Sequence, residues 1–276
     1  MPDRKTRAET RTDSAEDSRF GIGSGLAIRE TDQRSGIGIS DPRLAIRDER
    51  LTLFYLHGFA SSARSSKATY FAGKLRELGI ELHTPDLNEP DFSTLTISRM
   101  VDQVGKAIEG LSGPIVLIGS SLGAFVAVQV ALKHPARVDR MVLLAPALDF
   151  GPSTGSGPSR AESRDGGNRM RSLGDTGIEE WKRTGKLDVF HYAYGRILPV
   201  HYELYADARR HNCLDAALAM PIQVFQGRSD DAVDPDVVER WSRARPNVEL
   251  HMLDDDHQLG ASVGFIWEEM RRFLDL

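Results

Sequence analysis

The stretch Ile115-Val-Leu-Ile-Gly119-Ser120-Ser121-Leu122-Gly123-Ala124 decides the fold, and it contains the pentapeptide Gly-x-Ser-x-Gly. The apolar run at its start predicts a buried strand, and the small, apolar residues over 122–133 predict a helix. A strand–turn–helix unit is the context in which this motif holds a serine on a sharp, strained turn. Gly119 and Gly123 remove side chains that would collide on either side of the turn. The turn is therefore expected to hold the Ser121 hydroxyl above the sheet.

Ser121 is the candidate nucleophile of this motif. The backbone N–H of Leu122 opens the following helix, where the helix dipole helps it to face developing negative charge. Ser120 is the neighbouring alternative nucleophile, but it lacks the symmetric glycines. The plain alternative is a helix start rich in glycine and serine that carries no chemistry, and the flanking strand and helix count against it.

A serine hydroxyl is a poor nucleophile at neutral pH, so it needs a base, and that base needs an orienting carboxylate. The expected chain order for this motif is serine, then acid, then histidine. Asp230 follows a predicted strand over 222–226, and His257 follows a predicted strand over 248–253. Both would lie beyond the carboxyl ends of strands, where open α/β sheets place their sites. A triad of Ser121, Asp230 and His257 is therefore the hypothesis.

Each of these residues also has a plain interpretation. His257 alone could be a solvated loop histidine, and Asp230 alone could be a turn residue or a helix N-cap. Asp231 and Asp234 are alternative acids, although Asp234 stands directly before Pro235 and is better explained as an N-cap. The ordered occurrence of all three residue types favours the triad.

The second N–H of an oxyanion hole is expected in the loop His57-Gly58-Phe59-Ala60, which follows the first apolar strand. Gly58 lets the backbone approach a substrate, and the Phe59 N–H is the expected donor. His57 precedes the serine, which is the wrong order for the base, so it is interpreted as an organiser of the loop. Lys67, further along, is interpreted as a solvated surface charge, with a preference for anionic substrates as the alternative.

Strand and helix patterns alternate along residues 51–276. This alternation predicts one α/β domain with a mostly parallel sheet and helices on both faces. Further strands are expected at 51–56, 80–84 and 138–145, and further helices at 66–78, 93–111, 235–244 and 263–274. The segment 181–218 is rich in aromatic residues and is expected to be partly helical, either as a small cap lining an acyl pocket or as plain packing on the sheet.

Two segments differ from this pattern. Residues 1–50 have few apolar residues and balanced charges, which predicts a disordered tail. Residues 151–171 are rich in glycine, serine and proline, which predicts a flexible insertion.

Composition excludes several classes of protein. The chain has 276 residues, a formal net charge of -5 and a single cysteine. The acidic balance argues against nucleic-acid binding, and one cysteine excludes internal disulfides and multi-cysteine zinc sites. No apolar run is long enough to span a membrane, and the N-terminus lacks a secretory signal, so a cytoplasmic location is expected. No metal-ligand spacing is visible, and neither a metal nor an organic cofactor is expected.

Three loops carry a resemblance to a known family. The run Phe54-Tyr-Leu-His-Gly-Phe-Ala-Ser-Ser-Ala-Arg-Ser-Ser-Lys67, the Gly-Ser-Ser-Leu-Gly turn and the run Gly-Arg-Ser-Asp-Asp-Ala-Val ending at Val233 resemble the α/β-hydrolase superfamily, and more narrowly the small YqiA/YcfP-like esterases. The resemblance covers roughly residues 51–276. It implies a three-layer fold and a serine hydrolase acting on small-molecule carboxylic esters or thioesters. The strands that open larger members are not visible here, which leaves room for a reduced sheet.

Other functions stay open at this point. The same residues can cleave amides, peptides or carbon–carbon bonds, and a ligand-binding relative that has lost catalysis or a docking protein that uses the tail are further alternatives. Dehalogenase and epoxide hydrolase chemistry is disfavoured because those members carry aspartate at the position of Ser121. The acyl-chain length, the leaving group and the oligomeric state are not specified by the sequence.

Overall fold

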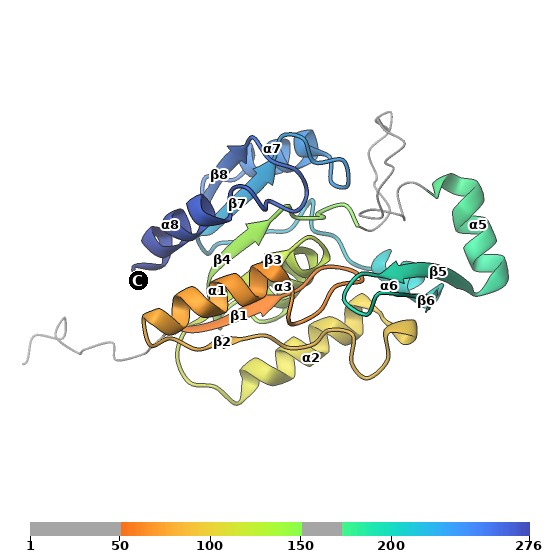
Figure 1. The fold of residues 1–276 in the computed structure, drawn as a ribbon, viewed down its shortest axis with the longest axis horizontal. Helices are drawn as coiled ribbons and strands as arrows, with labels where there is room; N and C mark the ends of the chain where they lie inside the picture. Colours follow the sequence, from red (N-terminus) through yellow and green to blue (C-terminus); the bar gives the residue numbers. More distant parts are fainter. Residues whose placement is uncertain (1–50, 151–172) are drawn as a thin grey trace, which may run out of the picture. The chain divides into compact units, whose positions relative to one another are not determined.

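The computed structural model describes residues 51–150 and 173–276 (Figure 1). Its strands are β1 (Thr52–Leu56), β2 (Leu82–His83), β3 (Ile115–Ser120), β4 (Val138–Leu144), β5 (Lys186–His191), β6 (Arg196–His201), β7 (Ile222–Gly227) and β8 (Val248–Leu253). Its α-helices are α1 (Ser66–Glu77), α2 (Ile97–Glu109), α3 (Leu122–Lys133), α5 (Gly174–Thr184), α6 (Glu203–Ala208), α7 (Pro235–Arg243) and α8 (Val263–Leu274). The predictions for residues 1–50 and 151–171 fall outside the described residues.

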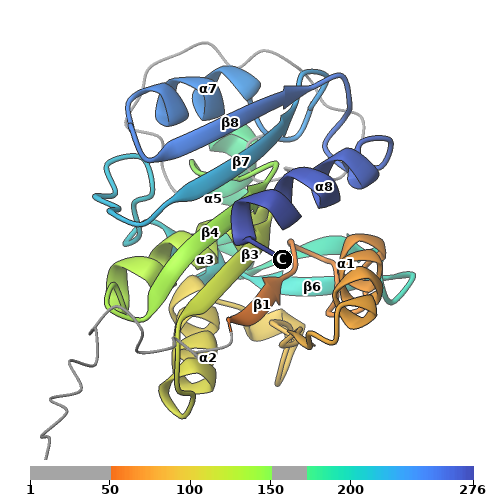
Figure 2. The ribbon, with the colours of Figure 1, turned by 90° about the vertical axis from the view of Figure 1, so that its left-hand side faces the viewer.

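Six strands form one sheet in the order β2-β1-β3-β4-β7-β8, and every neighbouring pair is parallel. Parallel neighbours need crossover connections, which α3 supplies between β3 and β4 and α7 supplies between β7 and β8. Figure 2 shows α1 and α8 on one side of the sheet and α2 and α3 on the other. This arrangement confirms the predicted fold class, an α/β fold with helices on both faces.

The period-two alternation of each strand divides the core into two layers. On one face, Leu53, Val116 and Val142 belong to a buried cluster with apolar residues of α1 and α8. On the other face, Phe54 and Leu117 belong to a cluster with residues of α2, α3 and α7. Since both faces are covered, the central strands β1 and β3 are nearly continuous apolar runs, which is typical of a parallel sheet.

Two predicted elements differ in extent. The strand expected at 80–84 is only the two-residue β2, which lies at the edge of the sheet beside β1. The helix expected at 93–111 is a short 3-10 turn, Phe92–Thr94, followed by α2. Thr96 separates them because its backbone is extended and its side chain accepts a hydrogen bond from the Arg99 N–H. Thr96 is therefore the N-cap that fixes the start of α2.

The aromatic segment contains a hairpin that the sequence pattern did not predict. Between α5 and α6, strands β5 and β6 pair in antiparallel fashion, with Phe190 opposite Ile197. Gly185 before β5 and Gly195 before β6 both have positive φ, at 75° and 63°, which glycine adopts without steric cost. The expectation of a partly helical segment holds for α5 and α6, whereas the hairpin between them was missed.

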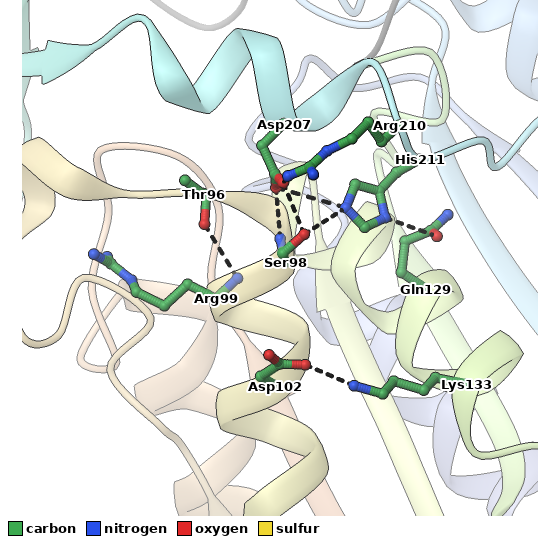
Figure 3. A network of polar contacts seen from close by, with 9 residues as sticks. All are labelled: Thr96, Ser98, Arg99, Asp102, Gln129, Lys133, Asp207, Arg210 and His211. Atoms are coloured by element: carbon green, nitrogen blue, oxygen red, sulfur yellow. Dashed lines mark hydrogen bonds and ion pairs between the residues drawn. The ribbon is translucent and has the colours of Figure 1, made fainter.

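A polar network joins this segment to the main domain (Figure 3). The buried carboxylate of Asp207 in α6 accepts hydrogen bonds from the backbone N–H and the hydroxyl of Ser98, each at 2.7 Å. His211 contacts the Ser98 hydroxyl on one side of its ring and Gln129 of α3 on the other. Burial pushes the pKa of Asp207 up, but the hydrogen bonds from Ser98 and Arg210, together with the nearby His211, hold that pKa below its usual value. Asp207 thus caps the first turn of α2 from another part of the chain.

Candidate active site

Ser121 lies on the turn between β3 and α3 with φ 54° and ψ -116°. A positive φ is uncommon for a residue with a Cβ, and such strain persists only where the surroundings hold it. Here the Ser121 N–H donates to the Leu144 carbonyl at 2.9 Å, and its own carbonyl accepts from Ala147 at 3.3 Å. The side chain makes no capping hydrogen bond with α3, which leaves the hydroxyl available for another partner.

The two glycines of the pentapeptide are required by close backbone contacts. A Cβ on Gly123 would lie 2.0 Å from the Leu56 carbonyl oxygen. A Cβ on Gly119 would lie 2.5 Å from the Ala124 Cα. Both contacts are with backbone atoms that cannot rotate away, so side chains at either position would force the turn apart.

The loop after β1 packs directly against this turn. A Cβ on Gly58 would lie 3.3 Å from the Ser121 Cβ and 3.9 Å from its hydroxyl oxygen. Across residues 51–150 and 173–276, the Phe59 N–H has no hydrogen-bond acceptor. Leu122 is the first residue of α3, so its N–H is one of the four without an intrahelical carbonyl. Among the described residues, both N–H groups therefore lack a hydrogen-bond acceptor, and Leu122 directly follows the serine.

His57 serves the loop rather than the serine. Its ring is buried, its Nε2 accepts a hydrogen bond from the Leu87 N–H at 3.0 Å, and its Nδ1 lies 2.9 Å from the Gly58 carbonyl oxygen. These contacts tie the Gly58 loop to the chain after β2. The interpretation of His57 as a loop organiser stays a prediction.

Asp230 and His257 meet at the carboxyl ends of β7 and β8. The His257 Nδ1 lies 2.9 Å from one oxygen of Asp230 and 3.1 Å from the other. The Asp230 side chain is fully buried, whereas that of His257 is 12% exposed. The carboxylate also accepts hydrogen bonds from the N–H groups of Ala232 and Val233 and from the Gln226 amide, at 2.8 to 2.9 Å. These donors satisfy the buried carboxylate and keep it aimed at the imidazole.

The two residues that follow His257 attach its loop to the core and to α1. Leu259 is fully buried in the same cluster as Tyr55 and Leu144, at the ends of β1 and β4. Lys67 of α1 donates to the Gln258 carbonyl at 2.7 Å. In the described part of the chain, no hydrogen bond links the Ser121 hydroxyl to the His257 ring. Such catalytic hydrogen bonds are often long before a substrate is bound.

The β5–β6 hairpin contacts the loop that follows β1. The Tyr192 N–H donates to the Ala60 carbonyl at 3.0 Å. Phe92 lies between the hairpin and the loop, with its ring centroid 4.7 Å from that of His191 and 5.5 Å from that of Phe59. Burial lowers the pKa of His191. The hairpin therefore supports the segment that carries the Phe59 N–H.

The alternative residues considered from the sequence occupy other environments. Ser120 is the buried last residue of β3, and its hydroxyl interacts with that of Tyr55. Asp231 is exposed, and Asp234 is the N-cap of α7, accepting from the Asp236 N–H at 3.0 Å. Asp230 is thus the acid of this loop that contacts His257.

One group of side chains has metal-ligand character. Among the residues that the structure describes, Glu249, His251 and Glu269 bring three ligand atoms within 4.8 Å of one another. These groups already form ion pairs, because His251 lies 2.8 Å from Glu249 and Arg272 lies 2.7 Å from Glu269. The group lies along β8 and α8, and it does not include Ser121, Asp230 or His257.

Two supporting residues of the site were not predicted from the sequence. Gln226 is fully buried at the end of β7 and donates to Asp230, and Lys67 holds the residue after His257. A glutamine inside an apolar strand run is a signal that points to such a role, because buried polar groups need partners. Lys67 was interpreted from the sequence as a solvated surface charge, and its hydrogen bond to the Gln258 carbonyl was not foreseen.

Comparison with known proteins agrees with this fold. Residues 52–156 match the model of an uncharacterised protein family, UPF0227. A curated relative, the biotin biosynthesis bifunctional protein BioHC of Teredinibacter turnerae, is 30% identical over 102 residues. That match covers 35% of this chain and 17% of the relative, so the chain corresponds to a small part of the relative's length.

Solved structures extend the likeness to most of the chain. The alpha/beta hydrolase domain-containing protein 10 from mouse has a TM-score of 0.62 at 17% identity, covering 81% of this chain and 89% of its own. Est1E from Butyrivibrio proteoclasticus with bound ferulic acid has the same TM-score and identity, covering 81% of this chain and 87% of its own. These likenesses confirm the expected resemblance to the α/β hydrolases. Within residues 51–150 and 173–276, no helix has the length and apolar character needed to cross a bilayer.

Proposed function

We propose that this chain, which has the α/β-hydrolase fold and resembles UPF0227 over residues 52–156, is a serine hydrolase of carboxylic esters or thioesters. The observation that carries the proposal is the buried Asp230 carboxylate 2.9 Å from His257, on the sheet edge where the strained Ser121 turn also lies. A triad recognised by geometry and roles needs these three groups.

The first half of the reaction forms an acyl-enzyme. His257 Nε2 takes the Ser121 proton as the hydroxyl oxygen bonds to the substrate carbonyl carbon. Asp230 stabilises the resulting imidazolium and holds its tautomer. The N–H groups of Phe59 and Leu122 bind the oxyanion of the tetrahedral intermediate. When that intermediate collapses, the imidazolium gives its proton to the departing alcohol or thiol.

The second half releases the acid. Water attacks the acyl carbon while His257 takes one of its protons, and the same N–H groups bind the second oxyanion. The C–O bond to Ser121 then breaks, and the serine recovers its proton from the imidazolium. No step requires a group other than water and these residues.

Two further points support acyl transfer that yields a carboxylic acid. Two free N–H groups next to Ser121 suit the oxyanion formed from an acyl carbonyl. Est1E, which shares the fold, binds ferulic acid, and a carboxylic acid is the product class of ester hydrolysis. We assign this product class to the present chain as part of the proposal.

The test is hydrolysis of p-nitrophenyl acetate and p-nitrophenyl butyrate by the parent chain and by Ser121→Ala. The variant is expected to lose on the order of a millionfold in kcat. Ser120→Ala is the matched control, because it removes the same hydroxyl one residue away, and it should retain its turnover. A parent protein that cleaves neither ester nor the corresponding thioesters would favour a non-catalytic ligand-binding relative. Full activity in Ser121→Ala would remove this serine from the mechanism.

A further inference from the structure

Lys67 connects the two loops on which the proposed chemistry depends. It lies in the first turn of α1, which follows the Gly58 loop, and its ammonium donates to the Gln258 carbonyl at 2.7 Å. The two residues are 191 positions apart in the chain. Because Gln258 follows His257 directly, this one side chain connects the helix after the oxyanion loop to the residue beside the base.

Lys67 is half-buried, and acidic side chains surround its ammonium. Three carboxylates act on the ammonium, those of Asp230 after β7 and of Asp255 and Asp256 after β8. A cation among these acids offsets the mutual repulsion between the loops after β7 and β8. Asp255 also accepts a hydrogen bond from the Ser262 N–H at 2.8 Å, so the loop is held at both of its ends.

We propose that Lys67 is a positioning residue, which holds the loop carrying His257 in place through the Gln258 carbonyl so that the imidazole can reach the Ser121 hydroxyl. The inference rests on the proposed function for its catalytic consequence, whereas the loop attachment itself can be measured without any substrate. Lys67 acts through His257 and needs no contact with the reacting atoms.

The protonation state of Lys67 provides an independent signature. Burial lowers its pKa to about 8, with the attraction of Asp256, Asp230 and Asp255 opposing that shift. Above this pH the amine is neutral, so it loses its attraction to the three carboxylates and donates a weaker hydrogen bond to Gln258. Turnover should therefore decline as the pH rises through about 8, and that decline should disappear when Lys67 is replaced by a group that does not titrate.

The experiment compares Lys67→Met with Lys74→Met. Both variants remove a lysine charge from α1, but Lys74 pairs with Glu77 of the same helix, at 3.2 Å. For Lys67→Met we expect kcat on p-nitrophenyl butyrate to fall about 10- to 100-fold, with KM changed by less than about twofold. Hydrogen–deuterium exchange should become faster in residues 254–259 and stay unchanged in β3 and β4. Lys74→Met should leave both measurements as they are in the parent.

Chemical rescue separates positioning from general damage. In Lys67→Cys, alkylation with 2-bromoethylamine rebuilds an amine of nearly the same length. Cys213 is the chain's single native cysteine; it is 1% exposed, and burial raises its thiol pKa far above the usual value, so it should resist the reagent. The alkylated protein should recover most of the lost turnover and slow exchange in residues 254–259. Its alkaline decline should lie at lower pH, because the thioether sulfur lowers the pKa of the new amine.

The outcomes are distinct. Unchanged kcat and unchanged exchange in Lys67→Met would overturn the proposal. So would a loss of turnover that alkylation of Lys67→Cys does not restore, or faster exchange spread evenly over the sheet. If the parent chain cleaves no ester, the proposed function fails, and exchange in residues 254–259 still decides whether Lys67 holds the loop.

Discussion

Replacing Asp230 by asparagine tests the contact between the acid and His257 at almost constant side-chain volume. One carboxylate oxygen accepts from the Ala232 and Val233 N–H groups, at 2.9 and 2.8 Å. The other accepts from the Gln226 amide and lies 2.9 Å from the His257 Nδ1. An asparagine oxygen would take the first position, which has two fixed backbone donors. The new NH2 group would then face His257.

This arrangement predicts the size of the effect. An NH2 group opposite the His257 Nδ1 favours the tautomer with its proton on Nε2, and that tautomer cannot accept the Ser121 proton. In serine protease triads, exchanging the orienting aspartate for asparagine lowers kcat about 10,000-fold, which corresponds to about 5 kcal/mol of transition-state stabilisation. We expect a loss of similar size for Asp230→Asn on p-nitrophenyl butyrate.

Asp231→Asn is the matched control for this measurement. Asp231 is the exposed neighbour of Asp230, so its variant should keep kcat/KM within about twofold of the parent. Thermal unfolding of both variants would show that each is folded at the assay temperature. The reasoning is refuted if folded Asp230→Asn keeps more than about a tenth of the parent activity, or if Asp231→Asn loses as much.

Two further substitutions test the packing that supports the site. In urea titrations, Gly123→Ala should lower the free energy of unfolding by about 3 kcal/mol or more, because its Cβ would lie 2.0 Å from the Leu56 carbonyl oxygen. Gly73→Ala is the control: the new Cβ would have no atom within 4 Å, so this variant should be as stable as the parent or more stable. Asp207→Ala should cost about 2 to 4 kcal/mol in the same titration at neutral pH, because two Ser98 donors lose a buried acceptor, and Asp102→Ala on the exposed face of α2 should cost less than about 1 kcal/mol. The pKa of Asp207 is lowered in the folded state, so its contribution to the free energy of unfolding is present above its ordinary pKa and is lost as the pH falls through the folded-state pKa. The stability difference between the parent and Asp207→Ala should therefore shrink on acidification. A difference that grows would contradict the assignment.

The main sheet could be predicted because its signals are local. The apolar run 115–118 and the alternating segment 248–253 are both strand patterns, and the glycines at 119 and 123 mark a turn in which a Cβ would collide with backbone atoms. The β5–β6 hairpin was harder to foresee, because Pro199 and several charged residues obscure the alternation of Leu187, Val189 and His191 toward the interior.

The candidate site divides in the same way. Ser121, Asp230 and His257 follow strands directly, so the sequence specifies their order and the sheet brings their loops to one edge. Gln226 leaves a local signal, a glutamine within an apolar strand run, whereas the Lys67 contact spans 191 residues and no local pattern predicts it. The Asp207 contact with Ser98 spans 109 residues and is equally invisible in the sequence.

Covalent labelling tests the central claim most directly, because it asks whether Ser121 is activated within this fold. The parent protein would be treated with a fluorophosphonate and digested, and the modified peptide would be identified by mass spectrometry, with Ser121→Ala and Asp230→Asn treated in parallel. The account predicts one adduct on Ser121, absent in Ser121→Ala and formed far more slowly in Asp230→Asn. A parent protein that hydrolyses esters yet carries no adduct on Ser121, or that is labelled at Ser120 instead, would contradict it.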